Sequence, residues 1–352
     1  YRKQFAMHHS ATPDEFRTAK SLFEDAVEGF TGMYSSNHAI VHTLNADRAR
    51  LLMMEPGNGQ DDPSKSREAF IMLGTSLESV AAQLGERHRD VLRLKAVMYA
   101  LSSKETAACV HESLKVNLLR LLELATEQFG KNHTLTIWIN YKVACHLKLM
   151  PRPADQLNAK HRLESIVAAW AKKFGRSHLK TAGAIGNLAT LLAHPNLANT
   201  GGQNQRDRGL KLMREVVAAH TEQLGSTSIT TLLHRNDLGH MLSIAGGSHY
   251  EEASAILTEL LPDCLRLLGD NNPITSTVRE NLATVTANLE HHIDMRDHFE
   301  RGKVTQSAAV EPLQEDSLPK QLRAQSSDNT DGGQATQPEG ADLVRTSSAE
   351  LC

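Results

Sequence analysis

Histidine is the residue type in this chain best suited to chemistry, because an imidazole can ligate a metal or transfer a proton near neutral pH. The 352 residues contain 18 histidines. Four of them, His38, His88, His133 and His178, each stand three residues after a glycine or serine in similar short stretches. A position that recurs in this way indicates a structural role in a repeated turn.

A separate histidine group could share one metal ion. His291, Asp294 and His298 are spaced i, i+3 and i+7, which places them on one face of a helix. Two imidazoles and a carboxylate are zinc ligands, but the pattern offers no fixed fourth partner. We interpret the group as a solvated helix end, and we predict no metal site and no cofactor.

Enzyme motifs are missing from the sequence. It contains no GxxxxGK[ST] phosphate loop, no GxGxxG, no HExxH and no GxSxG. The prediction is therefore a protein that is not an enzyme. A net charge of only −3 also argues against a general nucleic-acid binder, which would be basic.

The four cysteines predict a reducing compartment. Cys109, Cys145, Cys264 and Cys352 lie far apart and form no CxxC pair, as expected for reduced thiols in a cytoplasmic protein. The sequence has no apolar run of about 18 residues, so we expect no membrane partner. Its first residues, YRKQFAMHHS, neither resemble a signal peptide nor begin with Met, and we interpret the chain as a fragment of a longer one.

An internal repeat supplies the elements that must position any functional residue. Each repeat is counted here from a start residue, which usually is a glycine that follows a helical pattern such as Leu119–Phe129. A glycine ends a helix at low cost, and Thr, Ser or Asn can cap the next one. We expect each unit to be helix, short turn, helix. The starts, spaced 50, 45, 45, 50 and 44 residues apart, are Ser35, Gly85, Gly130, Gly175, Gly225 and Gly269.

Two columns of small residues run through the repeats. They stand fourteen residues after and sixteen residues before each start, and ten of the twelve positions are Ala or Gly. Small side chains at fixed places predict that the two helices of a unit approach closely where they cross. The columns are Ala49, Tyr99, Ala144, Ala189, Gly239 and Ala283, and Ala19, Ala69, Leu114, Ala159, Gly209 and Ala253.

The apolar spacing and the breaker residues predict where helices begin and end. Helices are expected at 14–33, at 42–54 and at 275–290, the last continuing or capped over 291–301. Short turns are expected near 151–155 and 245–249. Two long loops, 55–66 and 194–206, would account for the two 50-residue spacings.

The repeat resembles a known family. The stretches LGDNNPITSTVRENLATV (268–285) and FGRSHLKTAGAIGNLATLL (174–192) look like tetratricopeptide repeats (TPR) of the kinesin-light-chain type. Their pattern is leucine-glycine, histidine, threonine and an asparagine-leucine-alanine run. The resemblance covers about residues 13–290 and implies an all-α, right-handed superhelical solenoid of helix-turn-helix repeats. Residues 1–302 would form this domain, beginning within a repeat.

The resemblance also implies which residues face the concave side. In the family the first helix of each unit lines that side, and positions 8, 11, 12 and 15 after the start face it. Asn187 and Asn281 match the family's asparagine, Asn236 stands one residue earlier, and Asp47, Val97 and Lys142 depart from it. The implied peptide-binding residues are Arg50, Arg93, Trp138, Tyr141, Lys142, Asn187, Asn236, His240 and Asn281.

These residue types suit peptide recognition. Trp, Tyr and Arg dominate interface hot spots, and an asparagine amide can pair with the backbone of an extended peptide. Structural interpretations stay open at this point: Trp138 packed between units, asparagines bonded across neighbouring helices, and arginines on a solvated surface.

The residues after 302 differ in composition from the repeats. Residues 303–352 contain four Lys and Arg against eight Asp and Glu, which gives a net charge of −4. Such a segment buries too little apolar surface to offset its ordering entropy, so we expect a disordered acidic tail.

The sequence therefore predicts a protein-binding scaffold or adaptor that holds a protein or peptide ligand in its concave groove, like a kinesin light chain. An alternative hypothesis is a C-terminal sensor or regulatory module of a larger nucleotide-dependent switch protein or enzyme. Neither nucleic acid nor membrane is an expected partner, whereas the rest of a longer parent chain could be one. No heptad region that would join a motor heavy chain is present.

Overall fold

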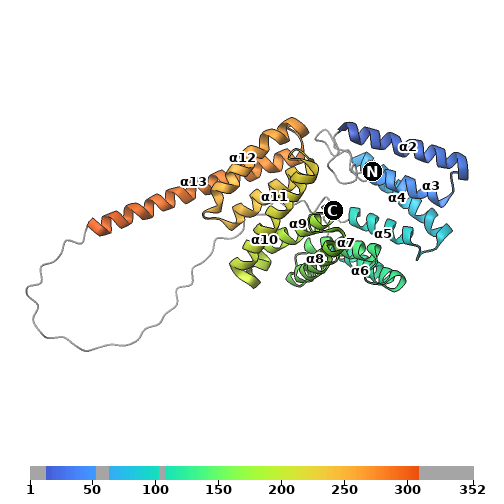
Figure 1. The fold of residues 1–352 in the computed structure, drawn as a ribbon, viewed down its shortest axis with the longest axis horizontal. Helices are drawn as coiled ribbons and strands as arrows, with labels where there is room; N and C mark the ends of the chain where they lie inside the picture. The colour runs from blue at the N-terminus through green and yellow to red at the C-terminus, as the bar shows by residue number, and fades with distance from the viewer. Residues whose placement is uncertain (1–12, 53–62, 103–107, 309–352) are drawn as a thin grey trace, which may run out of the picture. The chain divides into compact units, whose positions relative to one another are not determined.

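The computed structural model describes residues 13–52, 63–102 and 108–308, and in these ranges every regular element is an α-helix. Figure 1 labels them in chain order. They are α2 (Pro13–Tyr34), α3 (Ala39–Leu52), α4 (Pro63–Leu84), α5 (Arg89–Ser102), α6 (Ala108–Phe129), α7 (Thr134–Lys148), α8 (Pro153–Phe174), α9 (Leu179–Ala193), α10 (Pro195–Leu224), α11 (Ile229–Ala245), α12 (His249–Leu268) and α13 (Pro273–Ala308).

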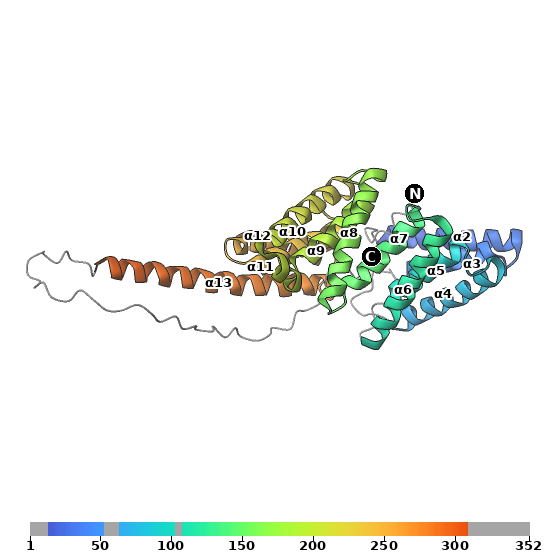
Figure 2. The ribbon, with the colours of Figure 1, turned by 90° about the horizontal axis from the view of Figure 1, so that it is seen from below.

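Consecutive helices pack against each other from α2 to α12, as Figures 1 and 2 show. The odd-numbered helices α3 to α13 are the predicted first helices of the units. Among them α5 contacts α7, α7 contacts α9, and α9 contacts α11. The chain is thus an all-α solenoid of tandem helix pairs, as the sequence predicts.

Each second helix ends at the start residue of the next repeat, where the backbone adopts a conformation that favours glycine. Gly175 has φ 93° and ψ 157°, and Gly269 has φ 87° and ψ 167°. These values belong to a region that essentially only glycine occupies, beyond the left-handed helical region that a helix-ending glycine usually adopts. Ser35 holds the same place in the first unit with φ 100°.

The repeat histidine caps the first helix, which the sequence does not reveal. In His133 the ring Nδ1 accepts a hydrogen bond from the backbone N–H of Leu135 (3.2 Å), and His178 accepts one from Lys180 in the same way (3.2 Å). His38 and His88 make the equivalent bonds. These four histidines are therefore structural N-caps.

The small-residue columns lie where the two helices of a pair cross. A Cβ atom on Gly209 of α10 would lie 2.9 Å from the carbonyl oxygen of Ala189 in α9. A Cβ atom on Gly239 of α11 would lie 2.7 Å from Leu257 in α12. The close approach predicted from composition is thus present in both pairs.

The core is continuous over most of the repeats. One cluster of buried side chains extends from Leu118 in α6 to Val285 in α13, and includes Leu147, Leu163 and Leu192. A second cluster joins α3, α4 and α5 through residues such as Leu73 and Leu94. Each helix pair is stabilised by burying its apolar face against its neighbours, as a repeat architecture requires.

The predicted loop at 194–206 is wrong. Residues 195–224 form the single long helix α10, so the extra residues of this unit lengthen a helix. Pro195 suits a first helical position because its ring fixes φ and no N–H bond is lost there. Gly201 and Gly202 weaken a helix by about 1 kcal/mol each relative to Ala but do not forbid it.

Other predicted boundaries need smaller changes. The helix predicted from 42 begins at Ala39, and α4 begins at Pro63, inside the loop predicted for 55–66. The turns at 151–155 and 245–249 are confirmed by the gaps before α8 and α12. Residues 1–12, 53–62, 103–107 and 309–352 lie outside the described residues, and with them most of the predicted tail.

The final helix α13 crosses a division of the chain into two compact units, one ending at Ala287 and one beginning at Asn288. The helix runs without interruption past residue 302, the predicted end of the repeats, to Ala308. In its second part His291, Asp294 and His298 are exposed. Within the described ranges, no three His, Cys, Asp or Glu side chains are placed to hold a metal ion.

Candidate ligand-binding face

One side of each first helix packs against the second helix of the same unit, and the opposite side faces away from that second helix. Ala189 of α9 lies against Gly209 of α10. Asn187 is two residues earlier, about 200° around the helix, so it points away from α10. The same reasoning applies to position 12 of every unit, which the resemblance places on the concave side.

Asn187 joins α9 to α7 on this side. Its Nδ2 donates to the hydroxyl of Tyr141 (2.9 Å), and its Oδ1 accepts from the Lys148 Nζ (2.8 Å). Lys148 also donates to the Thr190 hydroxyl (3.0 Å). Tyr141 and Asn187 are both buried, so the predicted residues form part of the contact between neighbouring units.

The same link recurs near the end of the repeats. The Nδ2 of Asn281 in α13 donates to the Oδ1 of Asn236 in α11 (2.9 Å). In both junctions position 12 of one unit donates to position 11 of the preceding unit. This agrees with the interpretation that asparagines bond across adjacent helices.

The link is absent between α9 and α11, because position 11 there is Gly186. The ring of His234 fills the space, and its Cε1 would lie 3.2 Å from a Cβ atom at Gly186. His234 is buried beside Asp237, with 3.8 Å between Nδ1 and Oδ2, and its ring centre lies 4.5 Å from that of His220 in α10, with the two rings tilted by 59°. The ring of His234 thus takes the place of the amide bond in this junction.

Two arginines surround one carboxylate at the N-terminal end of the row. The Arg93 Nη1 donates to the Asp47 Oδ1 (2.9 Å), and Asp47 is buried. Burial lowers the pKa of Arg50; nearby Asp47 opposes this shift and Arg93 adds to it. Arginine is effectively always protonated in proteins, so both cations contribute to the charge of this face.

Aromatic rings and a lysine gather in α7. The Lys142 Nζ lies 5.6 Å from the Trp138 ring centre and 5.7 Å from that of Tyr141, within cation–π range. Tyr141 also packs on Trp170 of α8 at 5.1 Å. Trp138 is partly buried against three core clusters, which agrees with its interpretation as a residue packed between units.

His240 lies one helical turn beyond Asp237 in α11. Burial lowers the pKa of His240, and the nearby Asp237 carboxylate opposes the shift. The imidazole is therefore neutral at pH 7 and offers one donor and one acceptor. The nine predicted residues follow one row along the first helices, and their role in binding stays a prediction.

Sequence reasoning missed Lys148 and Thr190, which bond to Asn187. Thr190 stands at position 15, one of the four positions that the resemblance places on this side, but the predicted set does not include it. Lys148 stands at position 18, outside those four, and reaches the row through its long side chain. Spacing alone could have found the threonine but not the lysine.

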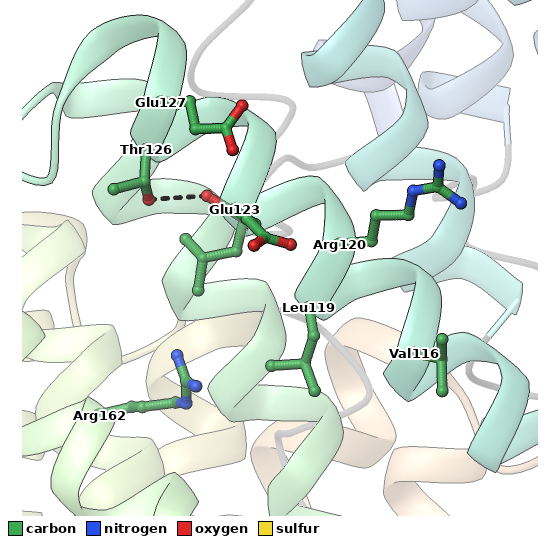
Figure 3. Close-up of a pocket in the computed structure, with 8 residues that line it drawn as sticks. Val116, Leu119, Arg120, Glu123, Thr126, Glu127 and Arg162 are labelled. Carbon is green, nitrogen blue, oxygen red and sulfur yellow. Dashed lines mark hydrogen bonds between the residues drawn. The ribbon is translucent and has the colours of Figure 1, made fainter.

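A shallow hollow lies elsewhere, along α6 (Figure 3). Val116, Leu119, Arg120, Glu123 and Glu127 line it from α6, and Arg162 lines it from α8. Nearly all of the lining comes from one helix, and both charge signs are represented. This arrangement encloses no small molecule and suggests no reaction.

No described helix is both long and apolar enough to cross a membrane. No family model matches the chain, and no curated protein sequence does so either.

Comparison with solved structures finds helical repeats. The nearly identical TPR-like repeats assigned to a kinesin light chain of Podosopora anserina are 16% identical to this chain, covering 63% of this chain and 98% of that one, with a TM-score of 0.47. A single-substitution variant of that protein gives the same identity and TM-score and is covered to 97%. A circular tandem repeat protein with novel repeat topology is 14% identical with a TM-score of 0.26, covering 81% of this chain and 79% of that one.

Proposed function

We propose that this chain is a protein- or peptide-binding scaffold whose ligand lies along the first helices. The supporting observation is the row of amide, aromatic and cationic side chains that runs along the first helices from Arg50 to Asn281. The chemistry is that of peptide recognition, since rigid aromatic rings and arginines supply binding energy and amides supply donors and acceptors.

The proposal includes a kinesin-light-chain-like adaptor role in the cytoplasm. The sequence resemblance of the repeats supports the kinesin-light-chain-like adaptor role. The buried thiol of Cys264, which forms no disulfide, supports the cytoplasmic location, because thiols persist in a reducing compartment.

A peptide-library binding screen on the full chain tests the proposal. The first variant combines Trp138→Ala with Asn281→Ala, both in the row and both only partly buried. A matched control combines Lys172→Ala with Lys211→Ala, which are exposed on the second helices α8 and α10. Circular dichroism confirms that each protein is folded.

We expect the wild type and the control to enrich the same peptides and the row variant to lose them. Equal enrichment by all three proteins, or enrichment by none, would remove the row as a ligand site and favour the regulatory-module hypothesis.

A further inference from the structure

Two kinds of residue occupy the cap position of the first helices. It is a histidine before α3, α5, α7 and α9, but Ser228 before α11 and Asn272 before α13. The backbone hardly differs between the two kinds: His178 has φ −60° and ψ 137°, and Ser228 has φ −64° and ψ 136°. The fold therefore does not require a histidine at this place, since a smaller polar residue adopts the same turn.

Each histidine cap depends on the charge state of its imidazole. The Nδ1 atom accepts a backbone N–H bond at 3.2 or 3.3 Å, so the hydrogen of the neutral ring lies on Nε2. Protonation turns Nδ1 into a donor, which cannot accept this bond. It also places a positive charge at the positive end of the helix dipole. The amide of Asn272, which accepts from Ile274 (2.9 Å), does not titrate.

Three of the imidazoles lie against an aromatic ring from the end of the preceding second helix. The pairs, with 4.8–4.9 Å between ring centres, are His38 with Tyr34, His133 with Phe129 and His178 with Phe174. Such a ring attracts an imidazolium, but this attraction does not restore the cap, because the bond needs the lone pair of Nδ1. The cap is therefore lost on protonation whether or not the imidazole stays on the ring.

Two lysines stand beside the caps of α7 and α9. Lys173 and Lys180 each have their Nζ 5.5 Å from the centre of the Phe174 ring, which His178 contacts. Lys173 also donates to the hydroxyl of Thr134, the first residue of α7. Like charges disfavour a further cation nearby, so the lysines oppose protonation but cannot replace a lost cap.

The next second helices contact these turns through amides and an ion pair. Glu215 of α10 pairs with Arg176 in the turn before α9 (2.7 Å). Glutamine side chains donate to turn carbonyls from Gln83 of α4 to Asn37 and from Gln223 of α10 to Ser177. An amide does not titrate, and a paired arginine and carboxylate carry no net charge. These contacts therefore do not compensate an imidazolium.

The cap of α5 differs because a carboxylate lies beside it. The Oδ2 of Asp90 is 3.8 Å from the Nδ1 of His88. A protonated Nδ1 can donate to this carboxylate in place of the bond that it loses, so we expect α5 to respond least to acid. The other charged pairs around this turn are Arg89 with Asp90 (3.9 Å), Arg93 with Asp90 (3.8 Å), Arg87 with Glu127 of α6 (3.9 Å) and Lys95 with Glu86.

We propose that the four histidine caps are an acid-sensitive device, which holds the first turns of α3, α5, α7 and α9 closed at neutral pH and releases them in mild acid. Histidine is the side chain whose charge ordinarily changes between pH 5 and 8. Loss of a typical cap shifts the opening equilibrium about fivefold. The first turns of α11 and α13 do not respond, because serine and asparagine do not titrate. The device goes beyond the proposed function and does not rest on it, since the caps act with or without a ligand.

Hydrogen exchange of the full chain, followed by mass spectrometry at pH 7 and pH 5 and corrected for the intrinsic rate at each pH, tests the device. The wild type is compared with a protein in which all four capping histidines are changed to Asn and with one in which all four are changed to Ala. Asparagine supplies an acceptor that does not titrate, as Asn272 does, whereas alanine supplies none.

In the wild type, we expect protection of the first turns of α3, α7 and α9 to fall about fivefold between pH 7 and pH 5, and that of α5 to fall less. The Asn protein should keep its protection at both pH values, and the Ala protein should lack it at both. The first turn of α13 is the internal control. His161→Asn is the matched control, because this side chain is 66% exposed on α8, and it should behave like the wild type.

Protection of the wild-type turns that does not change with pH overturns the inference. An Asn protein whose turns open in acid as those of the wild type do also overturns it, because the opening then has another cause. An equal loss of protection in α13 would mean general acid unfolding and has the same consequence. If a fourfold variant fails to fold, His178→Asn alone decides the question at α9. Exchange in the turns separates the caps from buried histidines, which act on unfolding of the whole protein.

Discussion

Ser35 shows how one residue can carry strain that the repeat avoids elsewhere. Among the described residues it is the one non-glycine with positive φ, at 100°, while the later repeat starts are glycines. An L side chain in this region costs about 1–3 kcal/mol. This strain lies in the turn between α2 and α3, the first turn that the structure describes.

Ser35→Gly should therefore stabilise the protein by about 1 kcal/mol, since glycine removes the strain but adds entropy to the unfolded chain. The free energy of unfolding in urea, measured with far-UV circular dichroism, reports the change. Ser36→Gly is the matched control and should be neutral or slightly destabilising. A Ser35→Gly protein no more stable than this control would contradict the strain argument.

The four capping histidines show the limit of sequence reasoning for single residues. Their recurrence predicts a structural role in the turn, and the structure confirms it. The atom responsible, Nδ1 accepting from a backbone N–H, does not follow from spacing because Ser, Thr and Asn are the usual caps. Asn272, at the same position in the last unit, makes the bond that those rules predict.

At the level of helices, the approach of α9 to α10 depends on Gly209. Its missing Cβ would lie 2.9 Å from a backbone oxygen, a contact that only a helix shift can relieve. Gly209→Ala should destabilise the protein by about 1–3 kcal/mol, although alanine has the better helix propensity. The midpoint of urea unfolding measures the effect.

Gly74→Ala is the control for that substitution. Gly74 lies inside α4 with nothing within 4 Å of a Cβ atom. Alanine there should stabilise the protein by up to about 1 kcal/mol. If both substitutions changed the free energy of unfolding in the same direction, helix propensity and not the close approach would determine both effects.

The amide link between α11 and α13 is testable by a double-mutant cycle. Asn236→Ala, Asn281→Ala and the double variant should show a coupling of about 0.5–1.5 kcal/mol in the free energy of unfolding, the usual net value of a hydrogen bond. A coupling near zero would show that the 2.9 Å contact contributes nothing to the stack.

The helix pattern was predictable because it recurs, and the errors fall where it does not. Gly175 and Gly225 stand 50 residues apart, and the excess looked like a loop because HPNLANTGGQNQR is rich in polar residues and glycine. The structure places it in α10, so the tertiary context overrides weak propensity. The positions of the predicted site residues follow from the spacing of the repeats. Their bonds to Lys148 could not be predicted in this way, because they depend on the length of the lysine side chain.

For the whole molecule, buried histidines link stability to pH. Burial lowers the pKa of His146 in α7, and its ring contacts His111, whose carbonyl oxygen lies 2.8 Å from Nε2. Lys115 of α6 lowers this pKa further, while Asp155 of α8 opposes the shift. Burial also lowers the pKa of His240 in α11.

These shifts share one sign, so their effects add. A histidine whose pKa is lower in the folded state binds fewer protons there than in the unfolded chain. Its stabilising contribution is complete above the unfolded pKa of about 6.5 and is lost as the pH falls toward the folded pKa. The urea midpoint should therefore decrease between pH 7.5 and pH 5.5, and His146→Gln should make this decrease smaller. A midpoint independent of pH in that window, or a slope unchanged in the variant, would mean that the imidazole of His146 charges as readily inside the solenoid as in the unfolded chain.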